Sequence, residues 1–165
     1  VKLSRMESGI IAVHSEDTTI KQMLESIQQQ FNVKVREKNI TLSLCDTDLH
    51  IRCDSKWTVE ALGNIVDNAI KYTACGGNVQ IKVEQYSFFV KIDIIDDGIG
   101  IEKEEIPKIF GRFYRSMSVT DQPGVGIGLF LAREIIQAQK GYIKVTSKRG
   151  KGSTFSVFLP IAKKE

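Results

Sequence analysis

Residues 60–73 read EALGNIVDNAIKYT and have the spacing of an amphipathic helix. At about 100° per residue the apolar and polar positions separate onto two faces. The apolar face, which we expect to pack on the core, contains Leu62, Ile65, Val66 and Ala69. The polar face contains Glu60, Asn64, Asp67, Asn68 and Lys71. A solvated surface is the simpler interpretation of this helix alone, but two asparagines cost about 1 kcal/mol relative to alanine, which calls for an explanation.

The polar face has the chemistry of a site for phosphate and a divalent cation. Asn68 offers a neutral carbonyl oxygen, a ligand that suits Mg²⁺ when water and phosphate oxygens complete the shell. Lys71, one turn later, would add positive charge beside the same phosphates. We therefore expect this face to line a triphosphate.

A second candidate site follows the apolar run at 94–101, IIDDGIGI. Gly98 and Gly100 allow a close backbone approach, although Asp-Gly is also a common turn. Asp96, at the end of a buried strand, can accept a hydrogen bond from the exocyclic amine of adenine, whereas guanine has an acceptor there. One such bond contributes about 1.5–3 kcal/mol, which is enough to select a base.

Two further segments have weaker signals. Gly124, Gly126 and Gly128 open a helix whose first amides could bind phosphate, although a flexible hinge explains them equally well. No strand precedes them as in a dinucleotide-binding fold, and no GxxxxGK[ST] occurs. Residues 101–123 look like a long loop with one helical turn near 106–110, in which Phe110 and Phe113 anchor the chain and Arg115 could reach a phosphate.

Hydrophobic periodicity predicts an α+β fold. The expected helices are 17–31, with Asp17 or Thr18 as N-cap, 55–73 and 126–139. The expected strands are 40–45 with 50–54 as a short partner, 78–86, 88–96 and a final pair around the loop 149–152. Strands that occur in pairs favour a mixed sheet of about five strands with three helices on one face.

Composition excludes several classes of protein. The 165 residues are 42% hydrophobic and 26% charged, which is ordinary for a globular domain. The formal charge of +3 is too small to indicate nucleic acid binding, and no apolar run is long enough for a membrane span. The three cysteines, Cys45, Cys53 and Cys75, are an odd number at wide spacings, as expected of reduced thiols in a cytosolic protein.

In this order the motifs resemble the catalytic, ATP-binding domain of bacterial sensor histidine kinases, which has the Bergerat (GHKL) two-layer α/β sandwich. The N box corresponds to 64–73, the first glycine box to 96–101, the F box to 109–115, the second glycine box to 124–129 and the last motif to 150–155. Residues 1–9 resemble the end of the family's dimerization and phosphotransfer helix, which leaves 10–165 as the catalytic domain, with an ATP lid at about 101–127.

The resemblance implies a role for each matching position. Asn68 would coordinate Mg²⁺, with Asn64 beside it, while Lys71 and Tyr72 would contact phosphate and the ribose side. Asp96 would bind adenine, and Arg115 would approach the γ-phosphate, so that Asn64, Lys71 and Arg115 would serve catalysis. The remaining nucleotide-binding positions would be Gly98, Gly100, Ile101, Phe110, Gly124, Gly126, Ile127, Gly128, Leu129 and Thr154.

The same resemblance favours phosphotransfer to histidine over hydrolysis. Hydrolytic relatives have a glutamate at the position of Asn64, and an amide cannot act as a general base; Glu60, one turn earlier, is a weaker candidate base. Neither His14 nor His50 is followed by the acidic residue expected after an acceptor histidine, so we expect this piece to bind Mg-ATP without phosphorylating itself. We also expect it to be monomeric. The implied partners are its own dimerization domain and a response regulator, in a homodimer anchored in the bacterial membrane. A nucleotide-binding module and an anti-sigma-type serine kinase are the alternatives.

Overall fold

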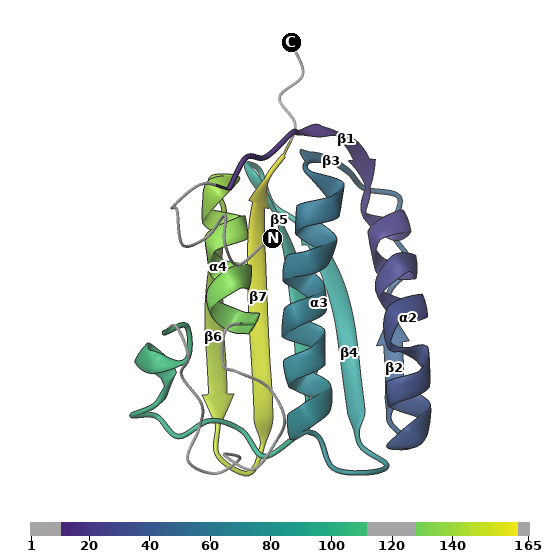
Figure 1. The fold of residues 1–165 in the computed structure, drawn as a ribbon, viewed down its shortest axis with the longest axis vertical. Coiled ribbons are helices and arrows are strands. Elements are labelled where there is room, and N and C mark those ends of the chain that lie inside the picture. The colour runs from purple at the N-terminus through teal and green to yellow at the C-terminus, as the bar shows by residue number, and fades with distance from the viewer. Residues whose placement is uncertain (1–10, 112–127, 162–165) are drawn as a thin grey trace.

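The computed structural model describes residues 11–111 and 128–161 of the chain, which form one layer of helices packed on one layer of strands (Figure 1). The helices are α2 (Ile20–Glu37), α3 (Ser55–Tyr72) and α4 (Gly128–Ala138), with a short 3₁₀ turn η1 (Ile106–Lys108). The strands are β1 (Glu16–Thr19), β2 (Thr41–Leu44), β3 (His50–Cys53), β4 (Asn78–Gln85), β5 (Phe89–Asp96), β6 (Tyr142–Lys148) and β7 (Gly152–Pro160).

The main sheet has five strands in the order β2-β4-β5-β7-β6. Strand β2 is parallel to β4, whereas the other neighbours are antiparallel, so the sheet is mixed as expected. All three helices cover the same face of this sheet, with α3 between α2 and α4 (Figure 1). The expected α+β two-layer sandwich is confirmed.

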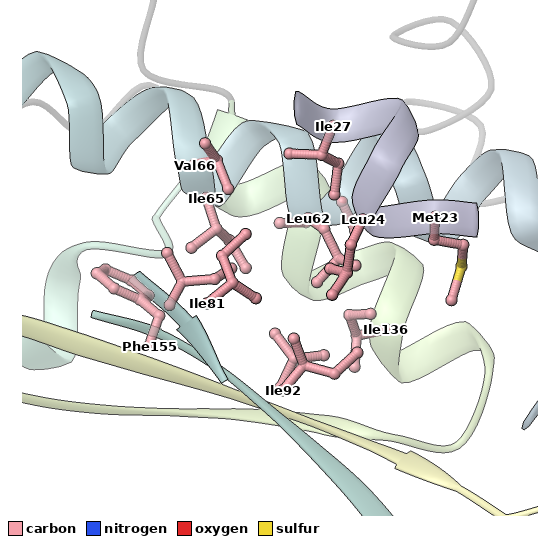
Figure 2. Close-up of a cluster of buried hydrophobic side chains, with 14 of the residues drawn as sticks. Met23, Leu24, Ile27, Leu62, Ile65, Val66, Ile81, Ile92, Ile136 and Phe155 are labelled. Atoms are coloured by element: carbon pink, nitrogen blue, oxygen red, sulfur yellow. The ribbon is translucent and has the colours of Figure 1, made fainter. Parts of the chain in front are cut away.

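The core lies between the helices and the sheet (Figure 2). The four residues expected on the apolar face of α3 are between 0% and 1% exposed. They meet alternate residues of the central strands, such as Ile81, Ile92 and Phe155, which are also almost completely buried. Because side chains alternate along a strand, this packing fixes which residues of β5 and β7 face the helices.

Two expectations about the first third of the chain are wrong. The strand β3 does not pair with β2; it forms a separate two-stranded sheet with β1, in which Thr18 lies opposite Ile51. The helix α2 begins after Thr19, whose hydroxyl accepts a hydrogen bond from the N–H of Gln22 at 3.3 Å, so neither expected N-cap residue is correct. Pairing between β1 and β3 extends the chain up to Thr19 and thereby delays the start of the helix.

Helix α2 also extends to Glu37, beyond the expected end at residue 31, whereas the remaining elements agree closely with the expected ranges. Helix α3 matches 55–73 to within one residue, and β4 and β5 form the expected hairpin. The expected helix at 1–9 and most of the loop at 101–123 lie outside the described residues, as do the first two residues of the expected helix at 126–139. The three cysteines are free thiols. Within the described part of the chain, no helix combines the length and apolar character needed to cross a membrane.

Candidate nucleotide site

Asp96 is the last residue of β5 and lies on the helix-facing side of the sheet. Its side chain is only 6% exposed, and its Oδ1 accepts a hydrogen bond from the N–H of Gly98 at 2.9 Å. Burial raises the pKa of this carboxyl from 3.8 to about 6, although backbone hydrogen bonds from Gly98 and Ser153 oppose the increase. A desolvated carboxylate at a strand end is well suited to accept a hydrogen bond from a ligand.

The two glycines after Asp96 are required by close backbone contacts. A Cβ on Gly98 would lie 2.2 Å from the carbonyl oxygen of Tyr72, at the end of α3. Gly100 has φ +74°, and a Cβ there would lie 2.2 Å from the carbonyl oxygen of Lys148, at the end of β6. Between them, the N–H of Ile99 donates to Tyr72 O at 3.1 Å. The loop after β5 is therefore held between α3 and the β6–β7 turn.

Asp97 has a structural role, in contrast to Asp96. Its carboxylate accepts hydrogen bonds from the backbone N–H and the side-chain Nδ2 of Asn78, at 2.8 and 2.9 Å. These bonds lower the pKa of Asp97. Asp97 thus joins the start of β4 to the end of β5, whereas Asp96 faces the helices.

The register of β7 places Thr154 on the opposite side of the sheet from Asp96. Asp96 pairs with Ser153, and Ile95 pairs with Thr154. Because successive side chains alternate, Ser153 shares the helix-facing side with Asp96, and Thr154 points to the uncovered face. Thr154 also helps to line a hollow of about 340 Å³ at this end of the sheet, and Asp96, Ser147 and Ser153 belong to the same lining. Ser153, which is 7% exposed, is the residue of this motif that the structure brings to Asp96.

The polar face of α3 meets the start of α4 at Asn64. A Cβ on Gly128 would lie 3.8 Å from Asn64 Cβ, an ordinary van der Waals contact, so residue 128 is next to Asn64. The Nδ2 of Asn64 is buried and has no hydrogen-bond partner among the described residues. A buried amide donor without a partner is costly unless a ligand satisfies it, which is consistent with a bound phosphate oxygen or water.

Asn68 lies one turn after Asn64 and is half-buried. The described residues contain no group of three or more His, Cys, Asp or Glu side chains that could hold a metal ion. The side chain of Asn68 carries one neutral oxygen, a ligand of the kind that suits Mg²⁺, which retains several waters and uses substrate phosphates as ligands.

Lys71 has a partner on its own helix. Its Nζ lies 3.5 Å from Asp67 Oδ2, and the other carboxylate oxygen of Asp67 accepts a hydrogen bond from Lys34 of α2 at 2.9 Å. Asp67 thus links α2 to α3. Lys71 lies at the end of α3 next to Tyr72, whose carbonyl oxygen accepts the bond from the loop after β5.

Phe110 is a core residue. Its ring is 8% exposed and makes an edge-to-face contact with Phe155, with 6.3 Å between centroids. The guanidinium of Arg133 lies over the same ring, 5.4 Å from the centroid. Phe110 therefore fixes the start of the loop to α4 and β7, as the sequence indicated for an anchoring aromatic.

The other predicted site residues divide into two groups. Ile101 and Leu129 are half-buried and pack against the core. Arg115, Gly124, Gly126 and Ile127 lie outside the described residues, so their predicted roles remain predictions. The structure brings Asp96, Gly98, Gly100 and Tyr72 together at one end of the sheet, and Asn64 together with Gly128.

The fold and these residues place the chain in a known family. Residues 53–163 match the family described as histidine kinase-, DNA gyrase B- and HSP90-like ATPases, and the chain belongs to it. The chain is 33% identical over 165 residues to the sensor histidine kinase WalK of Bacillus subtilis, with 97% of this chain and 27% of WalK covered. It is 30% identical to the sensor protein kinase PmrB of Pseudomonas aeruginosa, with 96% of this chain and 33% of PmrB covered.

The structural neighbours are also kinases of this kind. The catalytic domain of the histidine kinase ThkA superimposes with a TM-score of 0.79 at 26% identity, covering 90% of this chain and 96% of that one. A second ThkA structure contains the response regulator protein TrrA; it has a TM-score of 0.79 and 22% identity, covering 98% of this chain and 46% of that one. The chain is thus an ATP-binding catalytic domain of the sensor histidine kinase type, and it spans about a quarter to a third of WalK and PmrB.

Proposed function

We propose that this domain binds Mg-ATP and presents its γ-phosphate to a histidine on a dimerization domain of the same protein. The observation that carries the proposal is the buried carboxylate of Asp96 at the end of β5. The loop that follows it packs so closely that a Cβ on Gly98 or Gly100 would clash with the backbone. Adenine would place its exocyclic amine against this carboxylate. The triphosphate would extend toward the amides of Asn64 and Asn68 on α3.

In the proposed reaction a nitrogen of the acceptor imidazole attacks the γ-phosphorus. The new N–P bond replaces the bond to the β,γ-bridging oxygen, ADP leaves, and the imidazole loses its proton to solvent. When bound, Mg²⁺ would neutralise charge on the phosphates. Asn68 would hold the ion through its side-chain oxygen. Asn64 would donate to a phosphate oxygen or water from its Nδ2, which has no partner among the described residues.

The nature of residue 64 supports transfer over hydrolysis. An amide cannot remove a proton from water, so Asn64 provides no general base at this position. The described histidines, His14 and His50, are both exposed, and His50 lies 3.9 Å from Asp17 on a separate two-stranded sheet. We propose that the acceptor belongs to another part of a homodimeric, membrane-anchored protein, and that a response regulator receives the phosphoryl group.

The test is phosphotransfer in trans. The domain is incubated with labelled ATP and a separately produced dimerization domain that contains the acceptor histidine. Acid-labile label on that histidine supports the proposal. Label on a serine substrate, or no label although ATP binds, would contradict it.

A further inference from the structure

Ser147 of β6 makes three hydrogen bonds beside the candidate nucleotide site. Its Oγ accepts from the N–H of Ile101 at 2.8 Å and donates to the carbonyl oxygen of Gly152 at 2.9 Å. It also lies 2.8 Å from Ser153 Oγ. The strand register pairs Ser147 with Ser153 and Ser153 with Asp96, so the three side chains form one row across β6, β7 and β5.

The direction of the bond between the two serines follows from the fixed partners. An amide N–H can only donate and a carbonyl oxygen can only accept, and a hydroxyl has a single hydrogen. The hydrogen of Ser147 is used by Gly152 O, so the hydroxyl of Ser153 must donate to Ser147 Oγ. The lone pairs of Ser153 are therefore the part of its hydroxyl that remains available to a ligand.

The relative position of Ser153 and Asp96 is rigid. Gly152 has φ +91°, and a Cβ there would lie 2.0 Å from the carbonyl oxygen of Asp96. The carboxyl of Asp96 also accepts a hydrogen bond from the backbone of Ser153. The pairing of β5 with β7 therefore fixes the backbone positions from which both side chains extend.

We infer that Ser147 is a positioning residue for base selectivity. Ser147 Oγ accepts the hydrogen bond from the hydroxyl of Ser153, so Ser153 Oγ is left as a second acceptor beside Asp96. Two adjacent acceptors match an amino group with two N–H bonds, such as the 6-amino group of adenine, and repel a 6-oxo group. This inference rests on the proposed binding of ATP and adds a residue that does not touch the base.

The experiment compares two nucleotides that differ only in the amino group. Calorimetry measures the dissociation constants of ATP and purine riboside 5′-triphosphate, which lacks the 6-amino group, in the presence of Mg²⁺. In Ser147→Ala, Ser153 can rotate its hydrogen toward the ligand. We expect ATP affinity to fall about five- to tenfold, the loss of one hydrogen bond, with the affinity of the analogue unchanged. Ser147→Thr, which keeps the hydroxyl, should retain the wild-type preference.

Two further variants distinguish a failure of the proposed function from a failure of the inference about Ser147. Thr146→Ala, at the adjacent exposed position of β6, should leave both affinities unchanged. Asp96→Asn marks base recognition itself: if the wild-type domain does not prefer ATP, or if this variant keeps the preference, the proposed function fails. If Asp96→Asn loses the preference but Ser147→Ala keeps it, or weakens both nucleotides equally, only the inference about Ser147 is overturned. Should Ser147→Ala not fold, Ser147→Cys, a poor hydrogen-bonding partner, is judged by the same criterion.

Discussion

The two ends of the candidate site differ in how completely their polar groups are paired. At the base end, the loop after Asp96 is bonded to α3 through Ile99 and to the β6–β7 turn through Gly150, at 3.1 and 2.7 Å. At the phosphate end, the Nδ2 of Asn64 is buried without a partner among the described residues. From this contrast we expect the base pocket to be formed before binding and the polar face of α3 to be completed by the ligand.

The phosphate end should show the largest loss on mutation. Asn68→Ala removes the proposed Mg²⁺ ligand, and we expect ATP affinity in Mg²⁺ to fall by about 100-fold or more, because the ion joins protein and phosphates. The melting temperature should stay within a few degrees of wild type. Asp67→Asn, one position earlier and engaged with Lys34, is the control. Ordinary calorimetric binding of Mg-ATP by Asn68→Ala would refute the metal assignment.

The base end should be the more sensitive to changes in the backbone. Gly98→Ala inserts a Cβ at 2.2 Å from Tyr72 O, and we expect the free energy of unfolding to fall by about 3 kcal/mol. Gly76→Ala serves as the control, because Gly76 has φ +84° but open space around it; it should cost about 1–2 kcal/mol. Urea denaturation measures both. Equal costs would show that the contact with Tyr72 is not tight.

We expect the carboxylate of Asp96 to strengthen ATP binding and to lower the stability of the nucleotide-free domain. Asp96→Asn removes a buried charge, so we expect the nucleotide-free domain at pH 7.5 to gain about 1–3 kcal/mol of unfolding free energy. The same change should weaken ATP by about 1–3 kcal/mol, because a charged acceptor is lost. Denaturation and calorimetry on one sample test both signs. A variant that is less stable and binds ATP normally would contradict the role of Asp96.

The pH dependence of the nucleotide-free domain follows from the same carboxyl. Its pKa is about 6 in the folded state and near 3.8 when exposed, so between these values the folded state binds more protons. The contribution of Asp96 to stability is thus largest below pH 4 and is lost as the pH rises through 6. The difference in unfolding free energy between wild type and Asp96→Asn should therefore grow from pH 4 to 7. A difference that stays constant would rule out a raised pKa.

The smallest effects distinguish the two neighbours on β7. Ser153→Ala should weaken ATP about five- to tenfold, because its hydroxyl lies on the same face as Asp96. Thr154→Ala should change ATP affinity less than twofold, since Thr154 points to the uncovered face of the sheet. Calorimetric titration of both variants with ATP measures the two losses in affinity. A larger loss for Thr154→Ala would support the role in the adenine pocket that the sequence predicts for Thr154.

Much of the fold could be predicted because its signals are local. The apolar stripe of α3 and the alternation in β4 and β5 each lie within about twenty residues, and the positions of Asp96 and Asn68 follow directly from these elements. The pairing of β1 with β3 could not be predicted, because both strands have only four residues and their contact is non-local.

The register of β7 shows the limit more sharply. A shift of one residue along a strand moves a side chain to the other face, and only the register of β7 against β5 reveals that Ser153 is beside Asp96. The role of Ser147 depends on the same register, together with the hydrogen bond from Ile101, which is 46 residues away. Such contacts have no periodic signal in the sequence.

The most direct test of the account is a crystal structure of the domain with Mg²⁺ and a non-hydrolysable ATP analogue. We expect the adenine amine within 3.2 Å of the carboxylate of Asp96, and the metal ion bound to the side-chain oxygen of Asn68 at about 2.1 Å. Well-defined nucleotide density that lies away from Asp96, or a metal ion without Asn68 in its shell, would contradict it.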